Sequence, residues 1–212
     1  MIISPQRRYI FVHIPKTGGT SLAAALEERA ARDDILIGDT PKAKRRKARL
    51  KHLAPRGRLW KHSTLADVEG VVDPEGHFVF TLVRNPWDRM VSYYHWLRAQ
   101  GFDHLAVALA KRHDFPAFLA TPHVRATSRN GQSASYLTDI EGRYRGDLRA
   151  RLESPDDLDP LWDHLGFRLE MPRLNPSDRE ADWRLYYDEQ SAAMVAEDHA
   201  EDIAAFGYRF DP

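Results

Sequence analysis

The chain has 212 residues, of which 42% are hydrophobic and 29% charged, and this is enough to bury the core of one ordinary domain. Its 31 basic and 31 acidic side chains cancel, so no overall charge attracts nucleic acid or an anionic membrane. The absence of cysteine excludes a disulfide scaffold, a thiolate nucleophile and a cysteine-based zinc site. No signal-peptide core and no apolar run of about 18 residues is found, so we expect a cytoplasmic protein.

The N-terminal part of the chain predicts a strand, a glycine turn and a helix. Residues 9–14 form a run of β-branched and aromatic side chains that ends at Pro15, as in a buried strand. From Thr20 onward the sequence is rich in alanine, leucine and glutamate, which favour a helix. Gly18 and Gly19 lie between the two segments.

Residues 42–51 form a basic segment, with seven basic side chains in ten positions. Two interpretations remain open. The segment is either a solvated helix or loop, or it is a landing site for an anionic substrate.

The rest of the chain predicts a series of shorter elements. In order, they are a second short strand at 59–62, a capped helical turn at 63–68, a buried strand at 77–83, a helix from Pro86 to Arg98, an unassigned region at 101–150, a helix at 155–165 ended by Gly166, a loop at 172–177 and a closing helix at 188–206 stopped by Gly207. The alternation of strands and helices predicts an α/β fold, with a central parallel sheet flanked by helices. We expect residues 1–212 to form a single domain.

The turn after the first strand has the features of an anion site. The first amides of a helix have no intrahelical acceptors, and the helix dipole is positive at that end. Gly18 and Gly19 allow the backbone to approach a phosphate closely. Lys16 adds a positive charge, and Thr20 and Ser21 add hydroxyl donors.

The same turn does not fit the loop of ATPases and GTPases. In that loop a lysine follows the glycines, whereas Lys16 precedes them here, and no predicted strand ends in an aspartate that could hold Mg²⁺. Taken alone, the two glycines are also compatible with a simple tight turn.

A second group of polar residues follows the strand at 77–83. Arg84 stands at the carboxyl end of this strand, where α/β sheets place their ligands. Ser92 lies about two helical turns further on, so one large anion could contact both side chains. Arg89 is a further candidate contact. A guanidinium together with a hydroxyl suits a phosphate monoester.

These two motifs resemble those of the sulfotransferases that use 3′-phosphoadenosine 5′-phosphosulfate (PAPS). Residues 11–21, Phe-Val-His-Ile-Pro-Lys-Thr-Gly-Gly-Thr-Ser, resemble the loop that binds the 5′-phosphosulfate, and residues 83–94 resemble the 3′-phosphate motif. The likeness is to the type that includes heparan sulfate 2-O-sulfotransferase and many small bacterial enzymes. It extends over most of the chain and is weak at 30–58 and 100–128; further similar segments are 130–132, 136–137, 174–177, 187–189 and 202–210.

The resemblance implies a fold like that of the P-loop nucleotide kinases and transfer of a sulfuryl group without a metal ion. Adenosine 3′,5′-bisphosphate (PAP) would be the product. Lys16 would stabilise charge on the bridging and 5′-phosphate oxygens. Arg84 and Ser92 would hold the 3′-phosphate. The 5′-phosphosulfate would lie in a cradle formed by Thr17, Gly18, Gly19, Thr20 and Ser21.

The acceptor must lose a proton, for which histidine is the usual base. Of the ten histidines, His62 is the best candidate, because residues 61–67 resemble the region that carries the catalytic histidine of the heparan type. Trp60 departs from that pattern, since the heparan enzyme has another histidine there. We interpret His13 as a packing residue, and His95 as structural or near the acceptor.

The acceptor itself is not predicted beyond a hydroxyl or amine group. The basic segment 42–51 favours an anionic acceptor such as an acidic saccharide. Two other functions remain open, a nucleotide-binding protein without transfer activity and an ATP-dependent P-loop-like kinase. We expect no nucleic-acid partner and no metal site. The loop at 173–179 either closes over the 3′ side of the nucleotide or is an ordinary surface loop.

Overall fold

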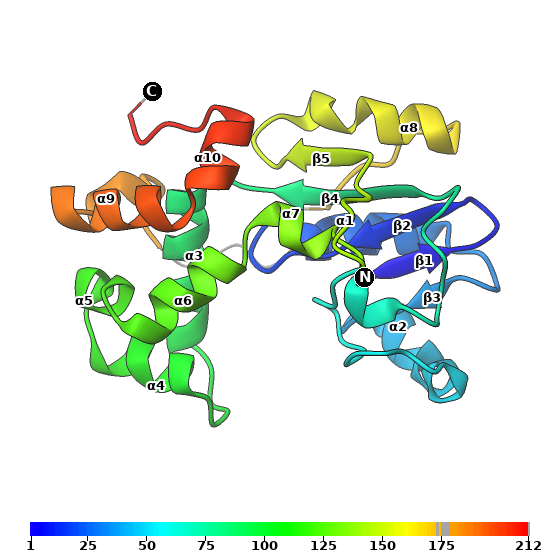
Figure 1. Cartoon of the computed structure of the whole chain (residues 1–212), viewed down its shortest axis with the longest axis horizontal. Coiled ribbons are helices and arrows are strands. Elements are labelled where there is room, and N and C mark those ends of the chain that lie inside the picture. Colours follow the sequence, from blue (N-terminus) through cyan, green and yellow to red (C-terminus); the bar gives the residue numbers. More distant parts are fainter. Residues whose placement is uncertain (173, 175–178, 212) are drawn as a thin grey trace. The chain divides into compact units, whose positions relative to one another are not determined.

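The computed structural model describes residues 1–172, 174 and 179–211, which divide into two compact units (Figure 1). The first unit contains Met1–Val83 and Ser133–Leu174, and the second contains Arg84–Gln132 and Asn175–Pro212. The single domain expected over 1–212 therefore stays a prediction. The loop expected at 172–177 lies mostly outside the described residues.

The first unit is built on a sheet of five strands in the order β3-β1-β2-β4-β5. The pairs β2·β4 and β4·β5 are parallel, which confirms the predicted parallel core. The pairs β1·β2 and β1·β3 are antiparallel, so the sheet as a whole is mixed. The strand bounds are β1 (Ile2–Ser4), β2 (Tyr9–Val12), β3 (Ile35–Leu36), β4 (Phe78–Val83) and β5 (Leu148–Arg151).

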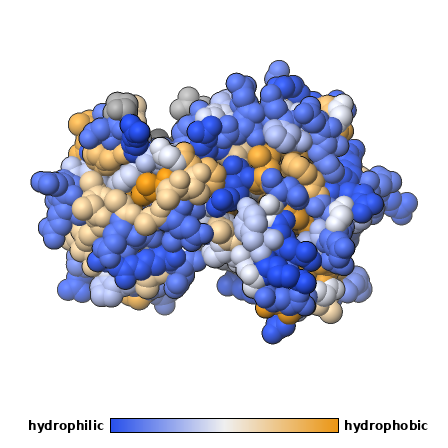
Figure 2. Space-filling view, turned by 45° about the horizontal axis from the view of Figure 1, so that its top comes forward, coloured by the Kyte–Doolittle hydropathy of each residue, from blue (hydrophilic) through white to orange (hydrophobic). Residues whose placement is uncertain are grey.

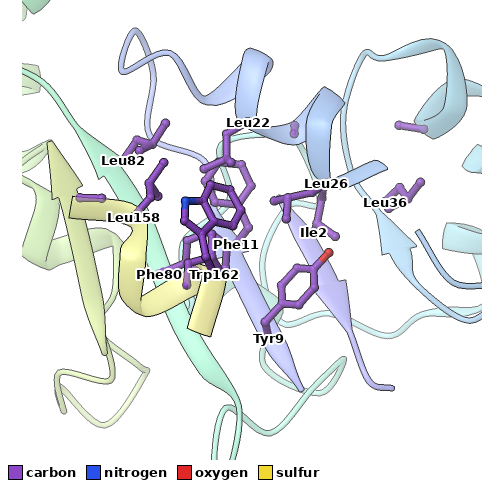
Figure 3. Packing of buried hydrophobic residues seen from close by; sticks show 14 residues of the cluster. Ile2, Tyr9, Phe11, Leu22, Leu26, Leu36, Phe80, Leu82, Leu158 and Trp162 are labelled. Carbon is purple, nitrogen blue, oxygen red and sulfur yellow. The ribbon is translucent and has the colours of Figure 1, made fainter. Parts of the chain in front are cut away.

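Both faces of this sheet are buried, because alternate residues of a strand point to opposite sides. One face packs Phe11 and Phe80 against Leu22 and Leu26 of α1 and Trp162 of α8, as Figure 3 shows. The opposite face packs another set of strand residues, Ile3, Ile10, Val12 and Val79, against Ile37, Leu65, Val68 and Leu137. The sequence of a strand that is buried on both faces is a continuous apolar run, and for this reason β2 and β4 could be predicted.

The helical segments of the first unit lie between these strands or after the last of them. They are α1 (Gly19–Glu28), α2 (Pro41–Arg46), η1 (Lys47–His52), η2 (Ala66–Val68), α7 (Ser133–Tyr136), η3 (Pro155–Leu158) and α8 (Asp159–Leu165). The predicted helix at 155–165 is confirmed as η3 and α8, and Gly166 ends it with φ 74°.

The strand predicted at 59–62 is wrong. This segment is a turn, in which the amide of Ser63 donates to the carbonyl of Trp60 at 3.0 Å. The Ser63 hydroxyl is fully buried and donates to the carbonyls of Arg58 and Trp60 at 2.8 and 2.9 Å. A buried serine that bonds its own backbone favours a turn over a strand.

The second unit is helical in its described part. Its elements are α3 (Pro86–Arg98), α4 (Leu105–Arg112), α5 (Phe115–Leu119), α6 (Pro122–Asn130), η4 (Trp183–Tyr186), α9 (Glu189–Asp198) and α10 (Ala200–Phe206). The predicted helix after Asn85 is confirmed, with the Asn85 side chain accepting from the Trp87 amide. The predicted closing helix is interrupted at His199, which separates α9 from α10.

The core of the second unit combines aliphatic and aromatic side chains. Trp87 and Tyr94 of α3 are buried with Phe115 and Phe118 of α5. In the view of Figure 2, hydrophilic residues cover most of the surface, and hydrophobic residues show between them. None of the helices in the described part of the chain combines the length and the apolar character that a membrane span requires.

Candidate active site

The loop that follows β2 has a backbone held in unusual conformations. Lys16 has φ 66°, which is rare for a residue other than glycine, and Gly18 has φ 79°. A left-handed lysine costs about 1–3 kcal/mol and persists only where surrounding structure enforces it. Left-handed residues next to a helix start turn successive amides toward one point and so form a concave anion site. The strain at Lys16 therefore supports a binding role for the loop.

The two glycines of the loop serve different contacts. A Cβ on Gly18 would lie 2.7 Å from Cδ1 of Leu152, the flexible end of a side chain. A Cβ on Gly19 would lie 2.2 Å from Cδ2 and 2.6 Å from Nε2 of His13. Gly18 is required mainly by its backbone conformation, whereas Gly19 makes room for the His13 ring.

The hydroxyl groups of the loop are not all available to a ligand. Thr17 is buried, and its hydroxyl donates to the carbonyl of Ile14 at 3.0 Å, so this side chain braces the loop. The Ser21 hydroxyl accepts from the amide of Leu174 at 3.2 Å. Thr20 is partly exposed in the first turn of α1. Thr17, which was predicted as part of the cradle, therefore uses its hydroxyl within the loop.

His62 lies beside this loop, within the first unit. Its Nδ1 is 2.7 Å from the backbone carbonyl of His13. A carbonyl oxygen can only accept a hydrogen bond, so Nδ1 carries the proton and Nε2 of the neutral ring has the lone pair. The contact thus fixes the tautomer that a general base requires.

The two histidine rings pack edge to face, with centroids 4.7 Å apart. Burial, with a smaller contribution from the charge of Lys61, lowers the pKa of His62 to about 4, against the hydrogen bond to the His13 carbonyl, which raises it. Burial also lowers the pKa of His13 well below its ordinary value. Both rings are therefore neutral near pH 7. The Trp60 ring also meets the His62 ring edge to face, 5.0 Å away between centroids, and Trp60 is 43% exposed.

The basic segment 42–51 forms α2 and η1, and part of its charge is used within the fold. Lys42 donates to the carbonyl of Glu27, Arg46 to that of Ala31 at 2.7 Å, and Arg49 to that of Arg32 at 2.6 Å. These carbonyls lie at the end of α1 opposite the loop, and four other cations of the segment are exposed: Lys44, Arg45, Lys47 and Lys51. Both interpretations of the segment remain open.

The second predicted anion motif lies in the second unit. Arg84 pairs with Asp88, its Nε and Nη2 each 2.7 Å from Oδ2. Asp88 and Ser92 are one helical turn apart on the same face of α3, and Ser92 is 2% exposed. Arg89 donates to the carbonyl of Gly131 at 3.2 Å, which ties it to the segment after α6.

His95 and several other polar and aromatic residues pack within the second unit. The His95 ring meets the Tyr186 ring edge to face at 5.0 Å between centroids. The Gln132 side chain accepts from the amide of Asp202 at 3.1 Å. Trp87 and Tyr94 are core residues, whereas Trp96 is 37% exposed.

Within the first unit, the structure thus brings the predicted loop and the predicted base together through His13. Within the second unit, Arg84 binds Asp88, and Ser92 lies one helical turn beyond Asp88 on α3. Sequence reasoning missed the contact between His13 and His62, because it joins residues 49 positions apart. The ion pair of Arg84 and Asp88 could have been predicted, because oppositely charged residues four positions apart lie close together at a helix.

Comparison with known proteins agrees with the sequence motifs. The model of the sulfotransferase family matches residues 1–136. A search of curated protein sequences gives no match. Among solved structures, the chain is similar to mouse sulfotransferase SULT7A1 complexed with PAP, with 16% identity, a TM-score of 0.48, and coverage of 97% of this chain and 87% of that one. A similarity at this level carries no conclusion about the ligands of this chain.

Proposed function

The chain belongs to the sulfotransferase family, and from this premise we propose that it transfers a sulfuryl group from PAPS to a hydroxyl or amine, with His62 as the general base. PAPS would supply the activated sulfuryl group and leave as PAP. The acceptor oxygen or nitrogen would form a bond to sulfur while the bond from sulfur to the bridging phosphate oxygen breaks. The proton of the acceptor would pass to Nε2 of His62.

One observation carries this assignment, the hydrogen bond of 2.7 Å between His62 Nδ1 and the His13 carbonyl. It leaves Nε2 as the proton acceptor. The low pKa of His62, about 4, keeps the ring unprotonated at neutral pH. A base with such a pKa is always in the correct form at pH 7, although it is a weaker base than an unperturbed histidine.

Two motifs would bind the two phosphate groups of the donor. Lys16 and the amides at the start of α1 would bind the 5′-phosphosulfate, with Gly18 and Gly19 allowing close approach. Lys16 would also stabilise the negative charge that develops on the leaving phosphate oxygen. Arg84 and Ser92 would bind the 3′-phosphate, which ATP lacks.

The acceptor is proposed only as a class. An anionic acceptor that used the exposed cations of segment 42–51 would have to reach past α1, whose 10 residues make it about 15 Å long. An oligomeric anion such as an acidic oligosaccharide meets this requirement better than a small metabolite. Kinship with the heparan sulfate 2-O-sulfotransferase type likewise remains a proposal, supported by the similarity of residues 61–67.

The test combines donor binding with transfer. Purified protein is titrated with PAP and followed by thermal shift, then incubated with radiolabelled PAPS and a panel of saccharide, phenol and amine acceptors. His62→Asn keeps a side-chain donor for the His13 carbonyl but has no base. We expect it to bind PAP normally and to lose about 10²–10⁴-fold in transfer rate.

The matched control is His52→Asn, because His52 is an exposed histidine of η1. It should keep both binding and transfer. Failure of the unmodified protein to respond to PAP would remove the donor assignment. Full transfer by His62→Asn would remove the base assignment and leave the donor assignment intact.

A further inference from the structure

A pocket lined by cations lies in the first unit, at the end of α1 away from the glycine turn. It has a volume of about 730 Å³ and is bounded by the turn that joins β1 and β2, the segment after α1, and η1. Its lining contains four arginines and one acidic residue, namely Arg7, Arg29, Arg32, Arg49 and Asp33. Ligand sites commonly have volumes of about 300–1,000 Å³. This arginine pocket therefore has the size of a ligand site and a charge that favours an anion.

The cations of the arginine pocket are poorly neutralised by the protein itself. Nη1 of Arg7 is 3.9 Å from Oδ2 of the buried Asp34. The two oxygens of that carboxylate already accept from a serine hydroxyl at 2.6 Å and a backbone amide at 2.8 Å. Arg29, Arg32 and Arg49 form no ion pair with any residue that the structure describes. The pocket thus keeps a net positive charge.

Neutral groups hold three of the four guanidiniums in position. Those of Arg7 and Arg29 lie over the Phe167 ring, 5.9 and 4.8 Å from its centroid. Nη1 of Arg49 donates to the carbonyl of Arg32 at 2.6 Å. A ring face or a carbonyl oxygen orients a guanidinium without cancelling its charge. The arginine pocket is therefore arranged to receive an anion from solution.

An ordinary solvated surface is the other interpretation of these arginines. The second unit offers a comparison, in which Arg125 and Arg129 bind Asp198 and Glu197. There two cations meet two carboxylates, and their charges balance. The arginine pocket instead gathers like charges from three segments of the chain on one concave surface, where they repel one another. A bound polyanion would relieve that repulsion.

The positive charge continues from the arginine pocket into the basic segment 42–51. A smaller pocket of about 150 Å³ shares Arg32, Asp33 and Arg49 with it and also contacts Arg46. The exposed cations of the basic segment lie on the same elements, α2 and η1. Such a series of cations suits an extended chain with repeated negative charges better than one small anion.

We propose that the arginine pocket docks the part of an acidic oligosaccharide acceptor that does not react. The proposed phosphate loop lies at the other end of α1, whose 10 residues span about 15 Å. A group bound in the pocket is therefore too far away to receive the sulfuryl group, and only a chain of several sugars reaches both places. This inference rests on the proposed function, because it assumes that the acceptor is an acidic saccharide.

The first experiment measures binding in the absence of PAPS. Size-graded heparin oligosaccharides, which carry sulfate and carboxylate groups, are titrated by calorimetry into the unmodified protein and its variants. Arg29→Gln/Arg32→Gln should weaken binding of the longer oligosaccharides by about 10-fold and make the dissociation constant less dependent on salt. Arg29→Lys/Arg32→Lys should recover part of the loss. Asp33→Asn removes the negative charge from the lining, so it should tighten binding.

The second experiment measures transfer from radiolabelled PAPS. With a long acidic acceptor, Arg29→Gln/Arg32→Gln should raise KM by about 10-fold and leave kcat unchanged, because docking away from the reacting group contributes equally to the ground state and the transition state. The KM for a disaccharide of the same polymer and the affinity for PAP should not change. A fall in kcat with either acceptor would contradict the docking role.

The matched control is Lys111→Gln/Arg112→Gln, because both residues are exposed at the end of α4 and their loss changes the net charge equally. It should bind the oligosaccharides as the unmodified protein does. Arg32→Gln alone serves as a milder variant, since its side chain has no hydrogen bond or ion pair among the described residues, and it should weaken binding by about 3-fold.

The outcomes separate the pocket from the proposed function. Unchanged oligosaccharide binding by Arg29→Gln/Arg32→Gln, or an equal loss in the control, would overturn the docking role while the proposed function stands. Tighter binding of single-stranded DNA with the same number of charges would overturn a saccharide as the ligand. No binding of PAP by the unmodified protein would overturn the proposed function, and the calorimetry without PAPS would still decide whether the pocket binds the chain.

Discussion

Replacement of Gly19 by alanine would show whether the proposed phosphate loop and the proposed base are packed against each other. Gly19 has no left-handed φ, so its backbone accepts alanine. In the first turn of a helix this change by itself stabilises a protein by about 0.5–1 kcal/mol. The added methyl group would, however, lie 2.2 Å from Cδ2 and 3.0 Å from Cγ of His13.

The His13 ring has little room to move away. It is 6% exposed and lies between the rings of Phe11 and His62, with centroid distances of 5.8 and 4.7 Å. Overpacking of this kind costs about 1–3 kcal/mol. After the helix gain is subtracted, we expect Gly19→Ala to lower the free energy of unfolding by about 0.5–2 kcal/mol, and the melting temperature by about 1–8 °C.

A double-mutant cycle separates the clash from other effects. His13→Ala removes the ring, so in that background Gly19→Ala should be neutral or stabilising, and the coupling energy should be about 1–3 kcal/mol. Urea unfolding followed by circular dichroism measures all four proteins. Gly101→Ala is the control, since a Cβ there meets nothing within 4 Å. Equal destabilisation by Gly19→Ala with and without the His13 ring would refute the packing argument.

Three further predictions concern the same loop and base. The acidic limb of the pH profile of kcat/KM should fall near pH 4 rather than 6.5, because the pKa of His62 is about 4. The lowered pKa of His62 also affects stability. The free energy of unfolding should fall as the pH decreases from 6.5 toward 4, because His62 of the unfolded chain takes up a proton in this range before His62 of the folded chain does. Thr17→Val should lower the free energy of unfolding by about 1 kcal/mol and leave PAP affinity unchanged, because the hydroxyl binds Ile14; weakened PAP binding at full stability would contradict this. Lys16→Met should reduce the transfer rate by about 10²–10³-fold, as measured with radiolabelled PAPS, whereas the exposed Lys51→Met should not change it.

The parts of the fold that could be predicted are those whose signal is local. The apolar runs of β2 and β4, Pro86 at the start of α3 and Gly166 at the end of α8 each act within a few residues. Strand β5 could not be recognised, because Leu148–Arg151 alternates with arginine and becomes a strand only by pairing with β4. Strands β1 and β3 are three and two residues long, too short for any periodic pattern.

Some residues of the candidate site likewise have a local signal in the sequence, and others do not. Lys16, the two glycines and Arg84 could be named because each motif is contiguous in the sequence. His13 was interpreted as a packing residue, and the structure does bury it, but its carbonyl also binds His62. For the loop at 173–179 the sequence left two interpretations open, and the ion pair between Arg179 and Asp88, 91 residues apart, exists only in the folded chain. Long-range contacts between polar groups leave no periodic trace in the sequence.

The contact between His13 and Gly19 changes what the double glycine means. A phosphate requires small residues where the backbone approaches it, and Gly18 meets that need with its left-handed φ of 79°. Gly19 is required for a different reason, because the His13 ring occupies the space of its missing side chain. The carbonyl of that same histidine orients His62. The proposed donor loop and the proposed base therefore share one packing contact, and a substitution that shifts His13 should impair PAP binding and transfer together.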